Sequence, residues 1–266
     1  IVYSLKCASS RIKYIIDQSN KNLKQAKLDY PFVIVEKDYK KILDKKIDLV
    51  VISTPTKTHY TLAKFFLKKT NVLIEKPLAL SSKDVNALEQ IGIKNNKKIF
   101  VDYPFIFSGS INYIKKIITK KKFGKLLEIE SYREQAPIRE DANVVWDLGV
   151  HDISIFQYLL NKNPYKISSN IFKTGSNKMN DSAYINMKYK DGLNIFVRNS
   201  WISSIKIRLI KFKFQNAIVI CDENEPIYKI KIYRKKKNNN LLYNVEIPDI
   251  DISEPLFTLV EYISKS

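Results

Sequence analysis

Asp147 and His151 are the two residues whose types and spacing best suit acid–base chemistry. They lie four residues apart within residues 143–160, and on a helix this spacing puts both side chains on one face, one turn apart. An imidazole titrates near neutral pH, and a neighbouring carboxylate raises its basicity. The spacing therefore predicts an acid–base pair on one wall of a cleft, although a helical pair of this kind is more often a surface or capping pair.

The element that must position this pair is an amphipathic helix. Gly149 lies inside the predicted helix, where glycine costs about 1 kcal/mol relative to alanine. This cost indicates a close approach of a ligand or of another backbone. The apolar stripe that can hold the helix against a core consists of Ile153, Ile155, Phe156, Leu159 and Leu160.

A second group of candidate residues follows two short apolar strands, at 47–53 and 72–74. Ligands of open α/β sheets bind beyond the carboxyl ends of the strands. A lysine in a partly desolvated cleft there can act as an electrophile or a proton donor. Each residue alone is weak evidence, because a lysine after a strand is usually solvated. The residues at these strand ends are Thr54, Pro55, His59, Glu75, Lys76 and Pro77.

Short apolar strands alternate with helices over the first 105 residues. This alternation is typical of a parallel α/β sheet of the nucleotide-binding type. Residues 1–105 are therefore predicted to form one α/β domain. The predicted strands are 1–7, 32–35, 47–53, 72–74 and 99–101, and the predicted helices are 11–25, 38–43, 58–69 and 81–95.

The pattern changes after about Phe105, where strands become dominant. Many of them alternate apolar and polar residues, which is typical of an antiparallel sheet with one open face. The fold class is therefore α/β, with a second domain over 106–266 whose open sheet is largely antiparallel. Besides the Asp147–His151 helix, this domain has a predicted helix at 111–119 and strands at 126–133, 168–174, 182–189, 194–200, 207–214, 217–221, 227–233 and 243–247.

The net charge of +19 comes from 40 lysines and only six arginines, set against 27 acidic residues. Arginine is the residue favoured for bidentate contacts with bases and phosphates. The lysines are spread along the chain, and the densest clusters, at 120–122 and 235–237, have the character of solvated turns. We therefore expect no nucleic-acid partner.

The sequence contains no apolar run long enough for a transmembrane helix and no signal-peptide pattern at its start. The two cysteines, Cys7 and Cys221, match no metal-binding or redox spacing. These features predict a cytoplasmic protein with free thiols, no metal site and no membrane partner.

Four motifs, in this order, resemble the Gfo/Idh/MocA family of nicotinamide-dependent oxidoreductases: ISTPTKTHY, VLIEKPLALS, VDYPFIFS and WDLGVHDISIFQYLL. The resemblance spans essentially the whole chain, and EKP followed about 70 residues later by D-x-G-x-H is specific to that family. The segments REDANVVWDLGVHDIS and NSWISSIKIRLIKF are similar to members that act on nucleotide-activated sugars in surface-polysaccharide loci.

The resemblance implies a Rossmann domain followed by an α/β domain whose open sheet carries substrate and oligomer contacts. It implies catalytic roles for Lys76, which would orient and polarise a sugar hydroxyl, and for Asp147 and His151, with His151 as the acid–base. Trp201, Lys206 and Arg208 match a subgroup motif on the second domain, and packing is the expected role of Trp201. The implied cofactor-binding residues are Ser9, Arg11, Ser53, Thr54, Pro55, His59, Glu75, Lys76 and Pro77, and the implied substrate contacts are Tyr103, Trp146, Asp152, Lys206 and Arg208.

The chain departs from the family pattern at its start, where no strand followed by a G-x-G-x-x-G turn is present. The run IVYSLKC resembles the family's second strand, so the first strand, the Gly-rich turn and a C-terminal piece are expected to be missing. The acidic residue that usually follows that second strand is also absent after IVYSLKC. Ser9 and Arg11 stand near this place, and because an arginine can accommodate a 2′-phosphate, they favour NADP over NAD as the cofactor.

The predicted function is hydride transfer between NAD or NADP and a hydroxyl or keto carbon of a sugar, with a nucleotide-activated sugar as the preferred substrate. The chain as given is expected to bind the cofactor poorly, and a homo-oligomer is expected through the open sheet. One alternative is a catalytically silent relative that uses the same fold to hold a cofactor or partner. A basic nucleic-acid binder is a third possibility, which would require salt-sensitive binding to DNA.

Overall fold

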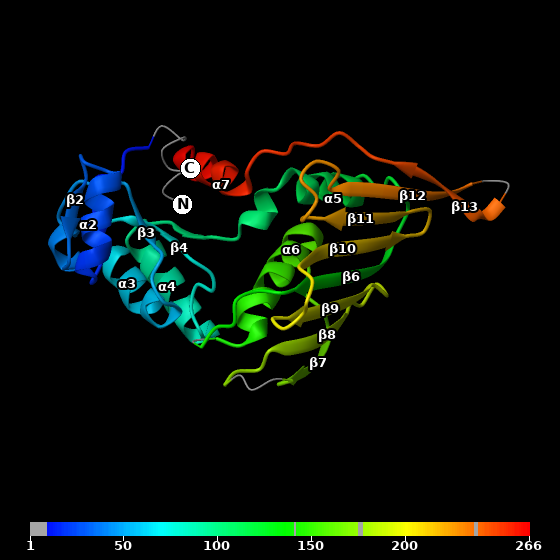
Figure 1. Ribbon diagram of the computed structural model, residues 1–266, viewed down its shortest axis with the longest axis horizontal. Helices are drawn as coiled ribbons and strands as arrows, with labels where there is room; N and C mark the ends of the chain where they lie inside the picture. The colour runs from blue at the N-terminus through cyan, green and yellow to red at the C-terminus, as the bar shows by residue number, and fades with distance from the viewer. Residues whose placement is uncertain (1–9, 141, 175–177, 237–238) are drawn as a thin grey trace. The chain divides into compact units, whose positions relative to one another are not determined.

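The structure is a computed structural model that describes residues 10–140, 142–174, 178–236 and 239–266. It consists of two compact units (Figure 1): unit 1 contains Ile1–Asp102 and Leu256–Ser266, and unit 2 contains Tyr103–Pro255. The sequence predicts a single domain over 106–266, whereas the last helix, α7 (Pro255–Ser264), lies mostly with unit 1.

Unit 1 contains two small parallel sheets. In one, β1 (Tyr14–Ile16) pairs with β2 (Ile34–Glu36), and in the other, β4 (Asn71–Ile74) lies between β3 (Leu49–Ile52) and β5 (Ile99–Val101). Residues 72–74 of β4 are completely buried, as expected for a strand with a neighbour on each side and helices on its faces.

Two helices of unit 1 begin at a serine that caps them. Ser19 accepts a hydrogen bond from the backbone N–H of Asn22, and Ser81 accepts one from Asp84. The buried side chains of Phe66, Leu67 and Leu88 join the strands in one core cluster. The helices are α2 (Asn20–Asp29), α3 (His59–Phe66) and α4 (Ser82–Lys94), with short 3₁₀ turns at η1 (Tyr39–Ile42) and η2 (Thr56–Thr58).

The helix predicted at 11–25 is wrong. Its first half contains β1, and α2 starts only at Asn20, after the Ser19 cap. Tyr14, Ile15 and Ile16 have high β-propensity, and the parallel partner β2 satisfies their backbone groups. The predicted strand at 1–7 lies outside the described residues.

A cavity of about 850 Å³ lies between the two sheets of unit 1. Residues of both β1 and β3 line it, and among the described residues each of these strands pairs with a single neighbour. In a doubly wound fold with strand order 3-2-1-4-5-6, this place belongs to the first strand. The order of the described strands therefore agrees with the predicted fold class, a Rossmann-type parallel sheet.

Unit 2 is built on one eight-stranded sheet with the order β13-β12-β11-β10-β6-β9-β8-β7. Every neighbouring pair is antiparallel except β6 and β9, which are parallel. The strands are β6 (Leu126–Glu134), β7 (Lys166–Phe172), β8 (Ser182–Lys188), β9 (Asn194–Ser200), β10 (Ile207–Phe214), β11 (Ile218–Asp222), β12 (Ile230–Lys236) and β13 (Asn239–Glu246).

Two helices, α5 (Gly109–Thr119) and α6 (Val150–Leu160), pack on one face of this sheet and form the largest core cluster with it. A 3₁₀ turn, η3 (Pro104–Phe107), precedes α5, and a π-helical turn, η4 (Val145–Gly149), runs directly into α6. Trp146 and Asp147 lie in η4, and His151 and Asp152 lie in α6.

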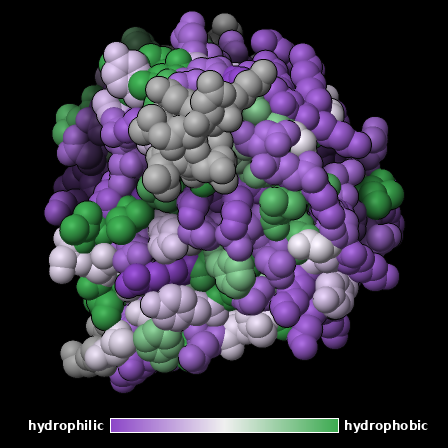
Figure 2. Space-filling view, turned by 90° about the vertical axis from the view of Figure 1, so that its right-hand side faces the viewer, coloured by the Kyte–Doolittle hydropathy of each residue, from purple (hydrophilic) through white to green (hydrophobic). Residues whose placement is uncertain are grey.

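The other face of the sheet is open and mixed in character. Tyr184 and Phe196 are about half exposed on it, and ion pairs such as Lys211–Glu130 cross neighbouring strands. Figure 2, which shows the right-hand side of the molecule in Figure 1, displays mainly hydrophilic residues with separate hydrophobic ones. None of the helices in the described part of the chain has the length and apolar character needed to cross a membrane.

Candidate functional site

The carboxyl ends of β3, β4 and β5 lie at one edge of their parallel sheet. Thr54 follows β3, Lys76 follows β4 and Asp102 follows β5. Backbone hydrogen bonds extend past the strands, from Glu75 N to Ile52 O at 2.9 Å and from Asp102 N to Ile74 O at 2.8 Å. This edge is the ligand-binding edge of open α/β sheets.

The predicted cofactor-binding residues of these loops differ in exposure. Ser53, Thr54 and Pro55 are exposed, and Glu75 and Lys76 are partly exposed. The peptide bond between Lys76 and Pro77 is cis, and Pro77 is buried. A ligand can therefore reach the backbone and side chains after β3 and the side chains of Glu75 and Lys76 after β4.

His59 ties these two loops together. Its ring lies 2.8 Å from the carbonyl oxygen of Pro77 through Nδ1 and 2.8 Å from that of Thr54 through Nε2. The residue is 1% exposed. The prediction that His59 contacts the cofactor is therefore corrected: its side chain supports the loops from inside the fold.

Asp17 is the acidic residue at the carboxyl end of β1, and the sequence reading missed it. Its carboxylate accepts hydrogen bonds from the backbone N–H of Ser19 at 2.7 Å and from Nδ2 of Asn22 at 2.9 Å. The bond from Asn22, followed by that from Ser19, lowers the pKa of Asp17 below its ordinary value. An ionised carboxylate therefore stands where a Rossmann fold contacts the cofactor ribose.

The placement of β1 removes the basis for preferring NADP. Arg11 precedes β1 and is exposed at its amino end, not at the carboxyl end where the nucleotide binds. Ser9 lies outside the described residues. The acidic residue that was thought to be absent is Asp17, which follows a different strand from the one expected.

Asp147 lies in the π-helical turn that precedes α6, a type of turn that is often found at functional sites. One of its carboxylate oxygens accepts a hydrogen bond from Nε1 of Trp201 at 2.9 Å, and the other lies 3.4 Å from Nη1 of Arg139. Trp201 is buried, as expected of a packing residue, and its indole also orients the carboxylate.

His151 lies in the first turn of α6 and is partly buried. The ring of Phe105, from η3, meets the imidazole edge-on, with the two centroids 5.1 Å apart and an angle of 85° between the planes. The guanidinium carbon of Arg133 lies 4.5 Å from the centroid of the same phenyl ring. Phe105 therefore forms one wall beside the candidate acid–base.

The structure does not support Asp152 as a substrate contact. Its side chain is completely buried and accepts hydrogen bonds from Ser131, Arg133 and Asn199, at distances between 2.9 and 3.2 Å. An ionised group buried in this way needs such partners. Asp152 therefore anchors α6 to β6 and β9.

The close approach predicted at Gly149 is made by a side chain of unit 2. A Cβ atom at this position would lie 2.9 Å from Oδ1 of Asn199 and 3.3 Å from Cγ1 of Val145. The same Asn199 donates to Asp152 through Nδ2. Glycine thus lets the π-helical turn lie against the polar cluster that holds α6.

The remaining candidate substrate contacts have different surroundings. Arg208 donates to the backbone oxygens of Glu134, Gln135 and Ile207, so its guanidinium holds the end of β6. Burial, followed by the charge of Arg133, lowers the pKa of Arg208. Tyr103 is partly buried just before η3, whereas Trp146 and Lys206 are exposed.

One of the two missed residues, Asp17, had a signal in the sequence, and the other, Phe105, had none. The run Tyr14–Ile16 followed by Asp17 and then the capping Ser19 has the form of a short strand, an acid and a helix start. Phe105 lies in the quoted motif VDYPFIFS, but nothing in that motif indicates a contact with His151. Such a contact depends on tertiary packing between η3 and α6.

Two family models match most of the chain. Residues 2–103 match the model described as "Oxidoreductase family, NAD-binding Rossmann fold", and residues 111–221 match the one described as "GFO/IDH/MocA C-terminal domain". The division between the two matches falls at the division between unit 1 and unit 2.

Curated relatives include sugar and inositol dehydrogenases. An inositol 2-dehydrogenase of Rhizobium meliloti is 27% identical over 130 residues, which cover 46% of this chain and 39% of that enzyme. A UDP-N-acetylglucosamine 3-dehydrogenase of Acidithiobacillus ferrooxidans is 28% identical over 131 residues, with the same two coverages of 46% and 39%. The chain therefore spans well under two thirds of the length of these relatives.

Solved structures have the same fold over nearly the whole chain. The Acidithiobacillus ferrooxidans enzyme has a TM-score of 0.83 at 19% identity, covering 99% of this chain and 84% of that one. An oxidoreductase from Agrobacterium radiobacter, solved with NAD+, L-tartaric acid and magnesium, has a TM-score of 0.80 at 16% identity, covering 98% and 80%.

Proposed function

Because this chain belongs to the Gfo/Idh/MocA family of oxidoreductases, we propose that it transfers a hydride between NAD and a hydroxyl-bearing carbon of a sugar. A nucleotide-activated sugar is the preferred substrate class. The names of two relatives, an inositol dehydrogenase and a UDP-N-acetylglucosamine dehydrogenase, support a polyhydroxylated substrate. The observation that carries the proposal is the position of Lys76, two residues after β4 at the ligand-binding edge of the parallel sheet.

The residues of unit 1 suit a dinucleotide. Asp17, ionised and partly exposed at the end of β1, can accept hydrogen bonds from both ribose hydroxyls and would repel a 2′-phosphate. Thr54 and Pro55 after β3 and Glu75 after β4 would line the cofactor. The bound nicotinamide would supply the hydride acceptor or donor. NAD is therefore preferred over NADP.

The proposed proton chemistry belongs to three side chains. Lys76 donates a hydrogen bond to the reacting oxygen and polarises it, while His151 takes or returns the hydroxyl proton. Asp147 keeps the first turn of α6 in place through Trp201 and Arg139. Trp146 and Lys206, which are exposed in unit 2, remain predicted substrate contacts.

The first experiment identifies the nucleotide that the protein carries. Protein expressed from its complete gene is purified and denatured, and any released nucleotide is identified by mass spectrometry. NAD release, together with formation of NADH from NAD+ and UDP-N-acetylglucosamine or myo-inositol, is the expected result. Release of NADP instead would contradict the role given to Asp17.

The Lys76→Ala variant tests the site itself. Loss of a hydrogen-bond donor to the reacting oxygen should lower kcat by about a hundredfold or more, while NAD binding is retained. Lys83→Ala, which removes an exposed lysine from α4, is the matched control and should leave turnover unchanged. Unchanged turnover in Lys76→Ala would remove Lys76 from the mechanism, and NAD binding without any turnover would favour the catalytically silent alternative.

Self-association through the open face of the eight-stranded sheet remains a prediction. The exposed rings of Tyr184 and Phe196 on that face support it, because an interface core favours aromatic residues. A cytoplasmic location likewise remains a prediction from the sequence.

A further inference from the structure

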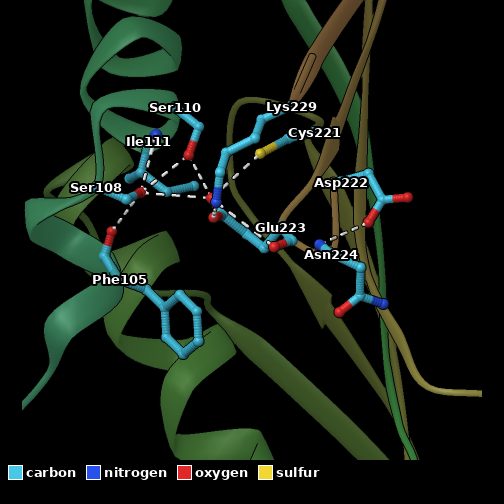
Figure 3. A network of polar contacts seen from close by, with 9 residues as sticks. All are labelled: Phe105, Ser108, Ser110, Ile111, Cys221, Asp222, Glu223, Asn224 and Lys229. Carbon is cyan, nitrogen blue, oxygen red and sulfur yellow. Dashed lines mark hydrogen bonds and ion pairs between the residues drawn. The ribbon is translucent and has the colours of Figure 1, made fainter. Parts of the chain in front are cut away.

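A polar cluster with no place in the proposed chemistry lies where α5 begins (Figure 3). Its centre is the carboxylate of Glu223, which follows β11 and is 6% exposed. Oε2 forms an ion pair with Nζ of Lys229 at 3.0 Å, and Oε1 accepts a hydrogen bond from Ser110 and a weaker one from Cys221 at 3.6 Å. A carboxylate at the start of a helix is also stabilised by the helix dipole.

Ser108 connects this cluster to the turn before the helix. It is the N-cap of α5 and accepts a hydrogen bond from the backbone N–H of Ile111. Its Oγ lies 2.9 Å from Ser110 Oγ, 3.4 Å from Glu223 Oε1 and 2.9 Å from the carbonyl oxygen of Phe105.

Counting hydrogens gives these contacts a direction. A carboxylate and a carbonyl oxygen only accept hydrogen bonds, and each serine hydroxyl supplies one hydrogen. Ser110 donates to Glu223, and Ser108 donates to the carbonyl oxygen of Phe105 while its Oγ accepts from the backbone N–H of Ile111. Glu223 therefore holds the first turn of α5 through Ser110, and Ser108, the N-cap of that turn, holds the backbone of Phe105 in η3.

The side chain of Phe105 points towards the candidate acid–base. Its ring meets His151 edge-on at 5.1 Å, and Arg133 covers it with its guanidinium carbon 4.5 Å from the centroid. Arg133 itself is held by Asp152 at 3.2 Å. The phenyl ring is thus fixed by Arg133 at its face and by Ser108 through its backbone.

We propose that Glu223 and Ser108 are positioning residues for His151: they hold Phe105 in η3, and Phe105 in turn fixes the orientation of the imidazole. This inference deepens the proposed function and rests on it for the catalytic meaning of His151. The mechanical link from Glu223 to His151 can be tested without any turnover. A cluster that merely joined β11 and β12 to α5 would leave the imidazole untouched.

Nuclear magnetic resonance of the full chain gives the direct measurement. The chain has two histidines, so ¹³C-labelled histidine yields one probe in unit 2 and one, His59, as an internal reference in unit 1. With phenylalanine labelled as well, the Phe105 ring should give a nuclear Overhauser effect to the ring protons of His151. The expected result is loss of this effect and a shift of the His151 signals in Glu223→Gln and in Ser108→Ala, with His59 unchanged.

Asp222→Asn is the matched control. Asp222 is the neighbour of Glu223, and its described side-chain contact is to the backbone N–H of Asn224 at 2.9 Å. This variant should keep the wild-type His151 signals. If Glu223→Gln fails to fold, Lys229→Gln removes the cation from the same carboxylate and replaces it in the test.

The outcomes separate the inference from the proposed function. Folded Glu223→Gln and Ser108→Ala variants with wild-type His151 signals overturn the inference, as does an equal change in Asp222→Asn. Where turnover is measurable, kcat should fall by about ten- to a hundredfold at unchanged KM, as expected for misplacement of a group by a fraction of an ångström. Altered His151 signals in a protein without dehydrogenase activity would retain the link and remove the proposed function.

Discussion

Asp17 is the single side chain on which the choice of cofactor is expected to depend. Asn22 and Ser19 lower its pKa, so it is ionised at neutral pH and can accept hydrogen bonds from the ribose. Replacing it by asparagine should weaken NAD binding about tenfold, a loss of about 1.4 kcal/mol for hydrogen bonds to a charged group. The affinity for NADP should fall less, because repulsion of the 2′-phosphate is removed as well.

Titration calorimetry with both nucleotides measures this effect. Asp29→Asn removes an equal charge from the end of α2, where the carboxylate is exposed and bonded to Gln25, and should leave both affinities unchanged. Equal NAD affinity in Asp17→Asn and in the wild type would show that Asp17 does not contact the ribose.

A residue's role could be proposed from the sequence where it follows from a local pattern. A role that depends on hydrogen-bond partners from other parts of the fold could not. Lys76 could be proposed because it lies two residues after an apolar strand. His59 was misassigned as a cofactor contact, since its two carbonyl partners lie in loops that only the folded sheet brings together. Asp152 was misassigned for the same reason, because its partners come from β6 and β9.

At the scale of elements, the π-helical turn η4 depends on the absence of a side chain at Gly149. A methyl group there would press on Asn199 Oδ1 at 2.9 Å, and Asn199 is completely buried. We expect Gly149→Ala to destabilise the protein by about 1–3 kcal/mol, as overpacking in a core does. Urea unfolding measures the change in the free energy of unfolding.

The control for this variant is Gln157→Ala, on the exposed side of α6. It alters the same helix without a packing change and should stay within about 0.5 kcal/mol of the wild type. A Gly149→Ala variant as stable as the wild type would mean that the turn can move away from Asn199 at little cost.

The elements themselves were predicted well where the apolar pattern is long, as in β3, α4, β9 and β10. Residues 11–25 were wrongly predicted as one helix because β1, with three residues, is too short to show the alternation of a strand. Its apolar residues also fit the apolar stripe of a helix. The spacing of apolar residues does not predict a π-helical turn. Its presence depends on Gly149 and on the neighbours that the folded sheet supplies.

At the scale of the whole molecule, the two-unit division was predicted from the change of pattern near residue 105, but the place of α7 was not. Along the sequence, the whole of unit 2 lies between this helix and the rest of unit 1. Sequence order alone assigns it to the nearer domain. Its buried residues, Leu259 and Val260, gave no sign of which core they join.

The charge of +19 is distributed in a way that argues against nucleic-acid binding. Five of the six arginines serve contacts inside unit 2. Arg133 pairs with Asp152, Arg139 with Asp147, Arg198 with Glu134 and Arg234 with Glu246, and Arg208 binds backbone oxygens. The 40 lysines are spread along the chain. Ammonium groups scattered in this way give weak, salt-sensitive attraction to phosphates.

We therefore expect binding to duplex DNA to be weaker than about 1 µM at roughly 150 mM salt, and to be lost as the salt concentration rises. Fluorescence anisotropy with two labelled duplexes of unrelated sequence measures both the affinity and its dependence on salt. The two duplexes should bind equally, because lysine contacts to phosphates carry no base information. Nanomolar binding at that salt concentration, or a preference between the duplexes, would require an organised basic surface and would bring back the nucleic-acid alternative.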